Sequence, residues 1–318
     1  MISRRNIRVK VMQALYALEA AMTAPAAAAI SEKEQSDLKY QGTKLLNADI
    51  QRASMLFTGS LLMMARVAQY AEMDAGNRAA KYLPSAEDLN VNTKIAGNTF
   101  LWELLDNNTF REKVEADKVS QMIDDEWIKK LYQQLVKSEE YSQYIAEQSR
   151  SYNAEKQIMQ FIWRKCMLEN EAFQEYIQDE WNGWEDDKEM TVMLVENFFR
   201  NNKNVNFLSF ISSEKQEYAR SLLTTTLDKE AYCMELIKPK LKNWDAERVA
   251  IIDLILLRMG VCEMLYFPTI PTKVTINEYI EIAKQYSTPQ SGQFVNGVLD
   301  NLLKELTKEN KIRKIERA

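Results

Sequence analysis

The sequence predicts an all-α protein, and three observations support that prediction. The 318 residues include only 8 Gly and 6 Pro, whereas average usage would give about 38 of these turn-forming residues. Long runs are rich in Leu, Ala, Glu, Lys and Gln, and 15 Met occur among them, a composition that favours helices. Near the N-terminus, apolar residues recur at helical spacing.

The first helix is expected from about Ser3, a suitable N-cap, to about Thr23. Its apolar stripe consists of Ile7, Val11, Leu15 and Leu18, which lie on one face of a helix. An Ala-rich link containing Pro25 follows. Further helical patterns cover about residues 36–80, 85–106, 110–148, 151–180, 188–200, 213–240, 245–265, 275–286 and 291–309.

Prolines and caps divide the C-terminal third into helices. Pro268 and Pro271 end the helix before them and favour an extended connection. Thr275 and Ser291 are expected to cap the two helices that follow. Gly297 lies inside the last of these helices and costs about 1 kcal/mol relative to Ala, so the sequence predicts a close packing contact at this position.

The rare residue types exclude several kinds of site. Histidine is absent, which excludes His-based triads, His general bases and His-containing zinc sites. Cys166, Cys233 and Cys262 form no CxxC pair, and we expect three reduced structural thiols. No catalytic residue, metal ligand or cofactor is predicted. Glu278 and Glu281 are three residues apart, and we interpret them as a solvated helix face.

The charge distribution is uneven. A net charge of −5 argues against a protein that coats nucleic acid indiscriminately, but both ends are basic and the middle is acidic. Arg4 and Arg8 lie one turn apart, where they could act on one phosphate-rich ligand. No stretch approaches the ~18 apolar residues of a membrane span. Arg8 and Glu19 also interrupt what would resemble a twin-arginine export signal, so we expect a cytoplasmic protein.

Three long motifs resemble one family. The segments RRNIRVKVMQALYALE, WDAERVAIIDLILLRMGVCEML and IPTKVTINEYIEIAKQYS followed by SGQFVNGVLD are similar, in that order, to the NusB family of bacterial transcription antitermination factors. The resemblance covers about residues 1–22 and 210–305. It implies a NusB-like helical bundle, residues 1–22 and 206–310, with a helical insertion of unknown role at 30–205 and a basic tail at 311–318.

The resemblance implies a non-enzymatic factor that binds RNA. Members of the family bind boxA-like single-stranded RNA together with NusE, a small-subunit ribosomal protein, and join RNA polymerase and other Nus factors in ribosomal RNA transcription. Guanidinium groups suit phosphates, and aromatic rings stack on unpaired bases. The positions that match the family's RNA-binding residues are Arg4, Arg5, Arg8, Tyr16, Lys273 and Phe294.

The same resemblance places the NusE interface on one helix. The candidate interface residues are Asp253, Arg258 and Glu263. Asp253 stands inside an otherwise apolar run, which favours an interface or an ion pair, and Arg258 also suits a simple pair with an acid.

Two departures from the family pattern concern RNA binding. Ile7 and Val9 flank Arg8, where the family often has a small residue and an acid, and Gln293 precedes Phe294, where Lys is common. One phosphate contact fewer should reduce the salt slope of binding by about 1. The tail offers four bases that could compensate: Lys311, Arg313, Lys314 and Arg317.

Of two other functions, the first remains open at this point and the sequence argues against the second. The first is a helical protein-binding scaffold with a decayed RNA site. The second is a ribosomal RNA cytosine methyltransferase, because NusB-like domains also precede such enzymes. That enzyme needs a Gly-rich cofactor loop, and no such loop follows the NusB-like motifs.

Overall fold

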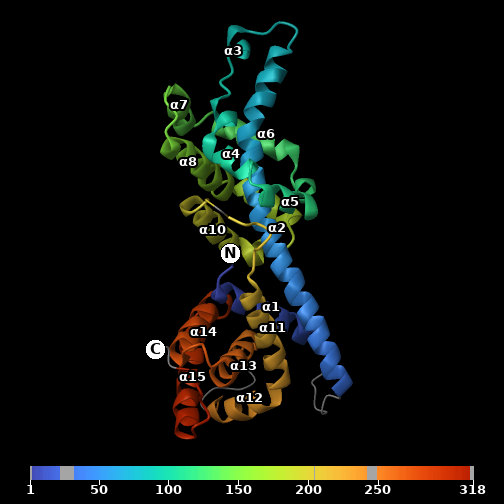
Figure 1. Ribbon diagram of the computed structural model, residues 1–318, viewed down its shortest axis with the longest axis vertical. Coiled ribbons are helices and arrows are strands. Elements are labelled where there is room, and N and C mark those ends of the chain that lie inside the picture. Colours follow the sequence, from blue (N-terminus) through green and yellow to red (C-terminus); the bar gives the residue numbers. More distant parts are fainter. Residues whose placement is uncertain (1, 22–31, 204, 242–248, 316–318) are drawn as a thin grey trace. The chain divides into compact units, whose positions relative to one another are not determined.

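A computed structural model describes residues 2–21, 32–203, 205–241 and 249–315, and these residues form helices without any strand (Figure 1). The all-α prediction is confirmed. The chain divides into two compact units. Ile2–Ile50 with Ile211–Ala318 form the terminal unit, and Gln51–Phe210 form the middle unit. The long helix α2 (Glu32–Ala79) contributes residues to both, so residues 32–50 belong with the first helix.

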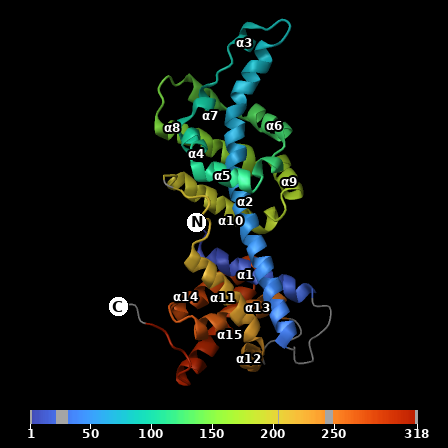
Figure 2. The same cartoon turned by 45° about the vertical axis from the view of Figure 1, so that its right-hand side comes forward.

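The terminal unit is built around one buried helix, α13 (Ile251–Tyr266), whose residues 255–264 are all buried. Helix α13 packs against most of the other helices of its unit (Figure 2). Trp244, which the sequence places just before this helix, lies outside the described residues. The other elements are α1 (Arg4–Ala21), α11 (Ser213–Asp228), α12 (Glu230–Ile237), η4 (Lys238–Leu241), α14 (Thr272–Tyr286) and α15 (Ser291–Lys308).

The predicted cap of the first helix is confirmed, and two others are wrong. Ser3 Oγ accepts a hydrogen bond from the Asn6 amide at 3.1 Å. Helix α14 begins at Thr272, so Thr275 lies inside it. There Thr275 Oγ1 donates to a buried carboxylate, Glu263 Oε1, at 2.7 Å. Ser291 is the first residue of α15 rather than its cap, and its hydroxyl donates to Asp253. Both hydroxyls donate in tertiary contacts, and Ser291 Oγ also accepts a hydrogen bond from the Thr288 amide at 3.1 Å.

The close packing contact expected at Gly297 is absent, and Gly260 provides one instead. A methyl group at Gly297 would meet nothing within 4 Å. A Cβ at Gly260 would approach Leu299 Cδ2 to 3.0 Å and Tyr279 Cδ2 to 3.4 Å. Gly260 therefore lets α13 approach α14 and α15 closely.

This difference predicts opposite effects for two identical substitutions. Gly297→Ala should raise the free energy of unfolding by about 0.5–1 kcal/mol, because Ala restricts the unfolded chain and favours a helix. Gly260→Ala should lower it by about 1–3 kcal/mol, because the added methyl group overpacks the core. Urea denaturation followed by circular dichroism measures both values, and an equal sign for the two changes would contradict the packing described.

The middle unit consists mostly of short helices. The sequence predicts longer ones over 85–106, 110–148 and 151–180, but polar residues cap new helices within these stretches. Asn98, Ser138 and Asn170 each accept a hydrogen bond from a backbone amide in the following first turn. The elements are α3 (Ala86–Leu89), η1 (Lys94–Gly97), α4 (Thr99–Leu105), α5 (Asn108–Ala116), η2 (Val119–Met122), α6 (Asp125–Leu135), α7 (Glu139–Ala146), α8 (Tyr152–Phe161), a π-helix η3 (Ile162–Leu168), α9 (Glu171–Glu180) and α10 (Trp184–Arg200).

Aromatic side chains fill the core of the middle unit. Trp181 is fully buried, its ring lies against Gly59 of α2, and its Nε1 donates to the Met122 carbonyl at 2.9 Å. Trp184 meets Trp181 edge to face, with ring centroids 6.4 Å apart. The middle unit thus has a core of its own.

Candidate functional site

A buried ion pair joins the first helix to α13 in the terminal unit. Arg8 is 2% exposed, and its Nε and Nη2 donate to Glu263 at 2.9 and 2.7 Å. Glu263 is 0% exposed and also accepts hydrogen bonds from the hydroxyls of Tyr218 (2.6 Å), Thr275 (2.7 Å) and Tyr279 (3.2 Å). Five hydrogen bonds therefore reach one carboxylate, from four side chains on three other helices.

The network keeps both partners charged. Burial acts to raise the pKa of the Glu263 carboxyl, but the Arg8 hydrogen bonds and charge, with the hydroxyls, hold it below its ordinary value. Burial acts to lower the pKa of Arg8, but the bonds to Glu263 raise it overall. Burial and the Glu263 charge raise the pKa of Tyr218. The carboxylate accepts every bond, and the phenols stay protonated to donate.

Arg4 and Arg5 lie at the surface beside this network. Arg4 Nη2 donates to Glu214 at 2.6 Å, and the Arg4 guanidinium carbon lies 5.6 Å from the centre of the Tyr218 ring. Arg5 makes a two-pronged contact with Glu278, both distances being 2.9 Å. Half of the Arg5 side chain and most of the Glu214 side chain are exposed. The Arg4–Glu214 pair, whose carboxylate is mostly exposed, contributes about 0–1 kcal/mol, so a phosphate can replace Glu214 at little cost. The Glu278 side chain is 20% exposed and holds Arg5 by two hydrogen bonds, so its replacement costs more.

Arg4 and Arg8 do not form one phosphate-facing pair. Both guanidinium groups lie near the Tyr218 ring, but Arg4 is at the surface and Arg8 is inside. The burial of Arg8 favours a structural role, in which it fixes the helix that presents Arg4 and Arg5. Its assignment to RNA stays a prediction.

The other predicted RNA-binding residues are dispersed. Tyr16 is 43% exposed and lies about three turns after Arg5 on the same helix face, but Val9 and Met12 between them are buried. Lys273 is exposed in the first turn of α14. Phe294 is 4% exposed and is part of the core. The structure therefore groups Arg4 and Arg5, while Tyr16 stands apart.

The three residues predicted to contact NusE are buried in α13. Asp253 accepts a hydrogen bond from Ser291 at 2.7 Å, and Glu263 binds Arg8. Arg258 is 5% exposed and pairs with Glu19 and Glu230, and burial lowers its pKa to about 10. All three have internal partners, so their assignment to a protein interface stays a prediction that this arrangement does not favour.

Two further residues, Tyr218 and Glu278, complete the site. The sequence does not single out Tyr218, because its position has the same helical spacing as the other apolar residues of α11. Glu278 was interpreted as part of a solvated face, but it binds Arg5 and lies 3.6 Å from Arg8 Nη1. Glu281 is exposed and pairs with Lys284, three residues later in the same helix. No local pattern in the sequence distinguishes the two glutamates.

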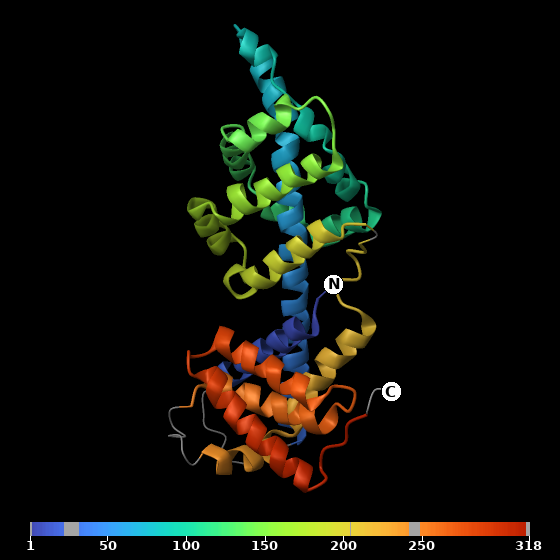
Figure 3. The same cartoon turned by 90° about the vertical axis from the view of Figure 1, so that its left-hand side faces the viewer.

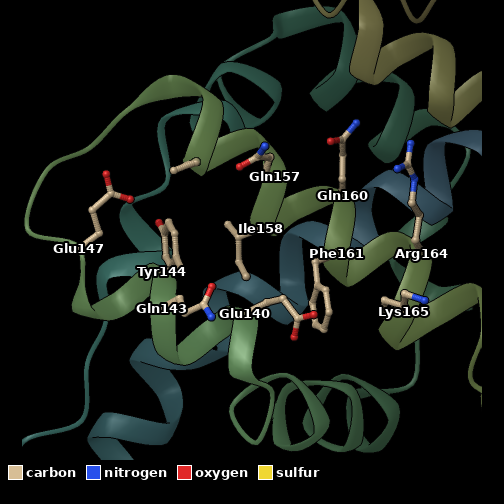
Figure 4. Close-up of a pocket in the computed structure, with 11 residues that line it drawn as sticks. Glu140, Gln143, Tyr144, Glu147, Gln157, Ile158, Gln160, Phe161, Arg164 and Lys165 are labelled. Atoms are coloured by element: carbon tan, nitrogen blue, oxygen red, sulfur yellow. The ribbon is translucent and has the colours of Figure 1, made fainter.

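A pocket of about 540 Å³ lies in the middle unit, lined by side chains from α7, α8 and η3 (Figure 4). Its two bases already have carboxylate partners, Arg164 with Glu196 and Lys165 with Glu169. Among the described residues, no three Cys, Asp or Glu side chains are grouped to hold a metal ion. None of the described helices combines the length and apolar character needed to cross a membrane.

Comparisons with known proteins agree with the C-terminal motifs. The model of the NusB family matches residues 184–304. The transcription antitermination protein NusB of Bacillus mycoides is 44% identical over 89 residues, which are 28% of this chain and 68% of that protein. The chain belongs to the NusB family. The match begins at Trp184 and includes α10, so it extends further toward the N-terminus than the motifs suggested, and it leaves out α1.

Other NusB relatives show how much of the chain is shared. The NusB protein of Salinibacter ruber is 43% identical over 103 residues, which are 32% of this chain and 64% of that protein. A solved structure of T. maritima NusB is 32% identical and covers 36% of this chain and 86% of that chain, with a TM-score of 0.30. The chain thus spans about two thirds of the curated relatives' length, and most of it lies outside the match.

Proposed function

We propose that this protein is a transcription antitermination factor that binds boxA-like single-stranded RNA together with NusE and acts in ribosomal RNA transcription with RNA polymerase and other Nus factors. The observation that carries the proposal is the pair of exposed arginines, Arg4 and Arg5, held at the start of α1 by a buried anchor one turn later. Membership of the NusB family supports it. No catalytic step is part of the proposal.

The arrangement suits phosphate binding for an electrostatic reason. Arg4 donates one hydrogen bond to Glu214, and Arg5 donates two parallel hydrogen bonds to Glu278. Phosphate oxygens accept hydrogen bonds from the same guanidinium donors. The Tyr218 ring lies beneath Arg4 and restrains its guanidinium. Lys273 is a further exposed base, in the first turn of α14, the helix that also carries Glu278.

Arg4→Ala combined with Arg5→Ala is expected to weaken binding of boxA-like RNA about 10- to 100-fold. The slope of log affinity against log salt concentration should become less steep by about 1.4, the value expected for the loss of two phosphate contacts to single-stranded RNA. Fluorescence anisotropy with boxA-like and scrambled RNA, with and without NusE, measures this. Helicity should not change, since both arginines are at the surface. Lys129→Ala with Lys137→Ala removes the same charge from two exposed positions of the middle unit, one in α6 and one just after it, and serves as the control.

A helical scaffold with a decayed RNA site is the second candidate, and the burial of Arg8 and Phe294 favours it. The same experiment separates the two. Wild-type protein that does not discriminate boxA-like from scrambled RNA, even with NusE, supports the scaffold and contradicts the proposal. Unchanged affinity in the double-arginine variant removes α1 from the RNA site.

A further inference from the structure

The residues that follow α15 turn back against their own unit (Figure 3). Asn310 adopts a left-handed conformation with φ 54°, and the Lys311 amide donates to the Leu306 carbonyl at 2.9 Å. This is the hydrogen-bond pattern by which a helix end is closed and the chain redirected. The helix therefore stops at Lys308, and the tail takes a defined direction.

Hydrogen bonds then fix the tail to the C-terminal end of α13. Lys314 Nζ donates to the carbonyls of Glu263 (2.9 Å) and Phe267 (2.8 Å), and the Ile315 amide donates to the Pro268 carbonyl at 3.0 Å. The last carbonyls of a helix lack partners within it, and a cation there is favourable. Lys314 is thus occupied as a helix cap. Arg317 lies outside the described residues.

Two lysines, one in the tail and one between α11 and α12, lie next to tyrosine rings. Lys311 Nζ lies 5.9 Å from the centre of the Tyr232 ring, and Lys229 Nζ lies 5.7 Å from the centre of the Tyr266 ring. The two rings belong to adjoining helices, because Cys233 and Cys262 have their sulfur atoms 3.4 Å apart. Tyr266 follows Cys262 by one helical turn and is 40% exposed.

The charge of this surface is basic. Lys229, Lys311 and Arg313 are all exposed. Glu309 pairs with Lys311 at 2.8 Å. Glu230, next to Lys229 in the chain, faces Arg258 instead. Ring faces beside exposed cations suit unpaired bases and their phosphates at the same time.

The surface is also connected to the one at the start of α1. Phe267, at the end of α13, packs edge to face on Tyr218 with centroids 5.7 Å apart. Tyr218 in turn lies under Arg4, 5.6 Å from the guanidinium carbon. The tail lies beside Phe267 through the Lys314 hydrogen bond. Contacts within the terminal unit therefore lead from one basic surface to the other.

We propose that Lys229, Tyr232, Tyr266, Lys311 and Arg313 form a second RNA-binding surface, the tail surface, which holds single-stranded RNA flanking the boxA-like element. The proposal rests on the proposed function for the identity of that element. It assigns Arg313 and Lys311 to phosphates and the two tyrosines to bases. Lys314 positions the tail and does not contact RNA.

The test uses the full chain and three RNAs in fluorescence anisotropy: a boxA-like element alone, the same element with about ten uridines on each side, and a uridine strand of equal total length. We expect wild-type protein to bind the extended RNA about five- to tenfold more tightly than the element alone. Lys229→Gln with Arg313→Gln should abolish this gain and leave binding of the element unchanged. Lys129→Gln with Lys137→Gln, in the other unit, should preserve the gain.

Each outcome decides the matter. A wild-type protein without the gain, or a variant that keeps it, overturns the proposal. If boxA-like and scrambled elements bind alike, the proposed function fails. Binding of the uridine strand still tests the tail surface, because the Lys229→Gln, Arg313→Gln variant should lose this binding and the Lys129→Gln, Lys137→Gln variant should keep it. Polyglutamate that displaces the uridine strand at equal charge concentration would assign the surface to an acidic polypeptide instead and overturn the proposal.

Discussion

Glu263→Gln is expected to lower the free energy of unfolding of the terminal unit by about 3–5 kcal/mol. The substitution leaves the Arg8 guanidinium, which is 2% exposed, without its hydrogen-bonded carboxylate, with Glu278 Oε2 3.6 Å from Nη1. Removing one partner of a buried pair is strongly destabilising. It also replaces one carboxylate oxygen with an amide NH2 group, which donates hydrogen bonds. The two Glu263 oxygens accept hydrogen bonds from the hydroxyls of Tyr218, Thr275 and Tyr279, so at least one of these bonds is lost. Urea denaturation monitored by circular dichroism measures the loss.

Two companion variants make this result specific. Arg8→Met with Glu263→Gln removes both charges and should recover part of the lost stability, since an apolar replacement of a buried pair is often tolerated. Glu281→Gln changes an exposed carboxylate on α14 and should alter stability by no more than about 0.5 kcal/mol. A similar effect at Glu281 and Glu263 would show that the buried network is unimportant.

Acid titration gives the same pair a second readout. The pKa of Glu263 is lowered in the folded protein. The stability that the carboxylate contributes is therefore fully present above the pKa of an unfolded Glu, about 4.3. This stability is lost as the pH falls through the pKa of the folded state. The Glu263→Gln variant should lack this component, and its stability should fall less steeply below about pH 4.3.

Trp181→Ala is expected to lower the free energy of unfolding of the middle unit by about 3–5 kcal/mol. Trp181 is 0% exposed, contacts Gly59 and Trp184, and donates to the Met122 carbonyl. Its truncation leaves a large cavity that the rigid helices can close only in part. The unpaired carbonyl adds a further cost.

A matched tryptophan serves as the control for this prediction. Trp102 belongs to the same unit and donates to a backbone carbonyl, that of Ala96, but it is 44% exposed. Trp102→Ala should therefore cost less than half as much in the same denaturation experiment. Equal losses for the two substitutions would contradict the core described for this unit.

Much of the fold could be predicted because helices depend on neighbours in the sequence. The stripe of Ile7, Val11, Leu15 and Leu18 and the cap at Ser3 depend on residues within a few turns, and the structure confirms the helix they predict. The two C-terminal motifs identify the family for the same reason, since each consists of residues close together in the chain. The capping residues that divide the middle unit were also present in the sequence, but they were outweighed by the long helical patterns around them.

The sequence by itself thus determined the helical class, the first and last helices and the family of this protein. Only the tertiary structure decided what its charged residues do. Arg4, Arg5 and Arg8 look alike in the sequence, but Arg8 meets a carboxylate 255 positions away and is buried with it. In the same way, Gly260 rather than Gly297 lies at the close helix contact. Helical periodicity shows which residues share a face, and only packing determines which face another helix covers.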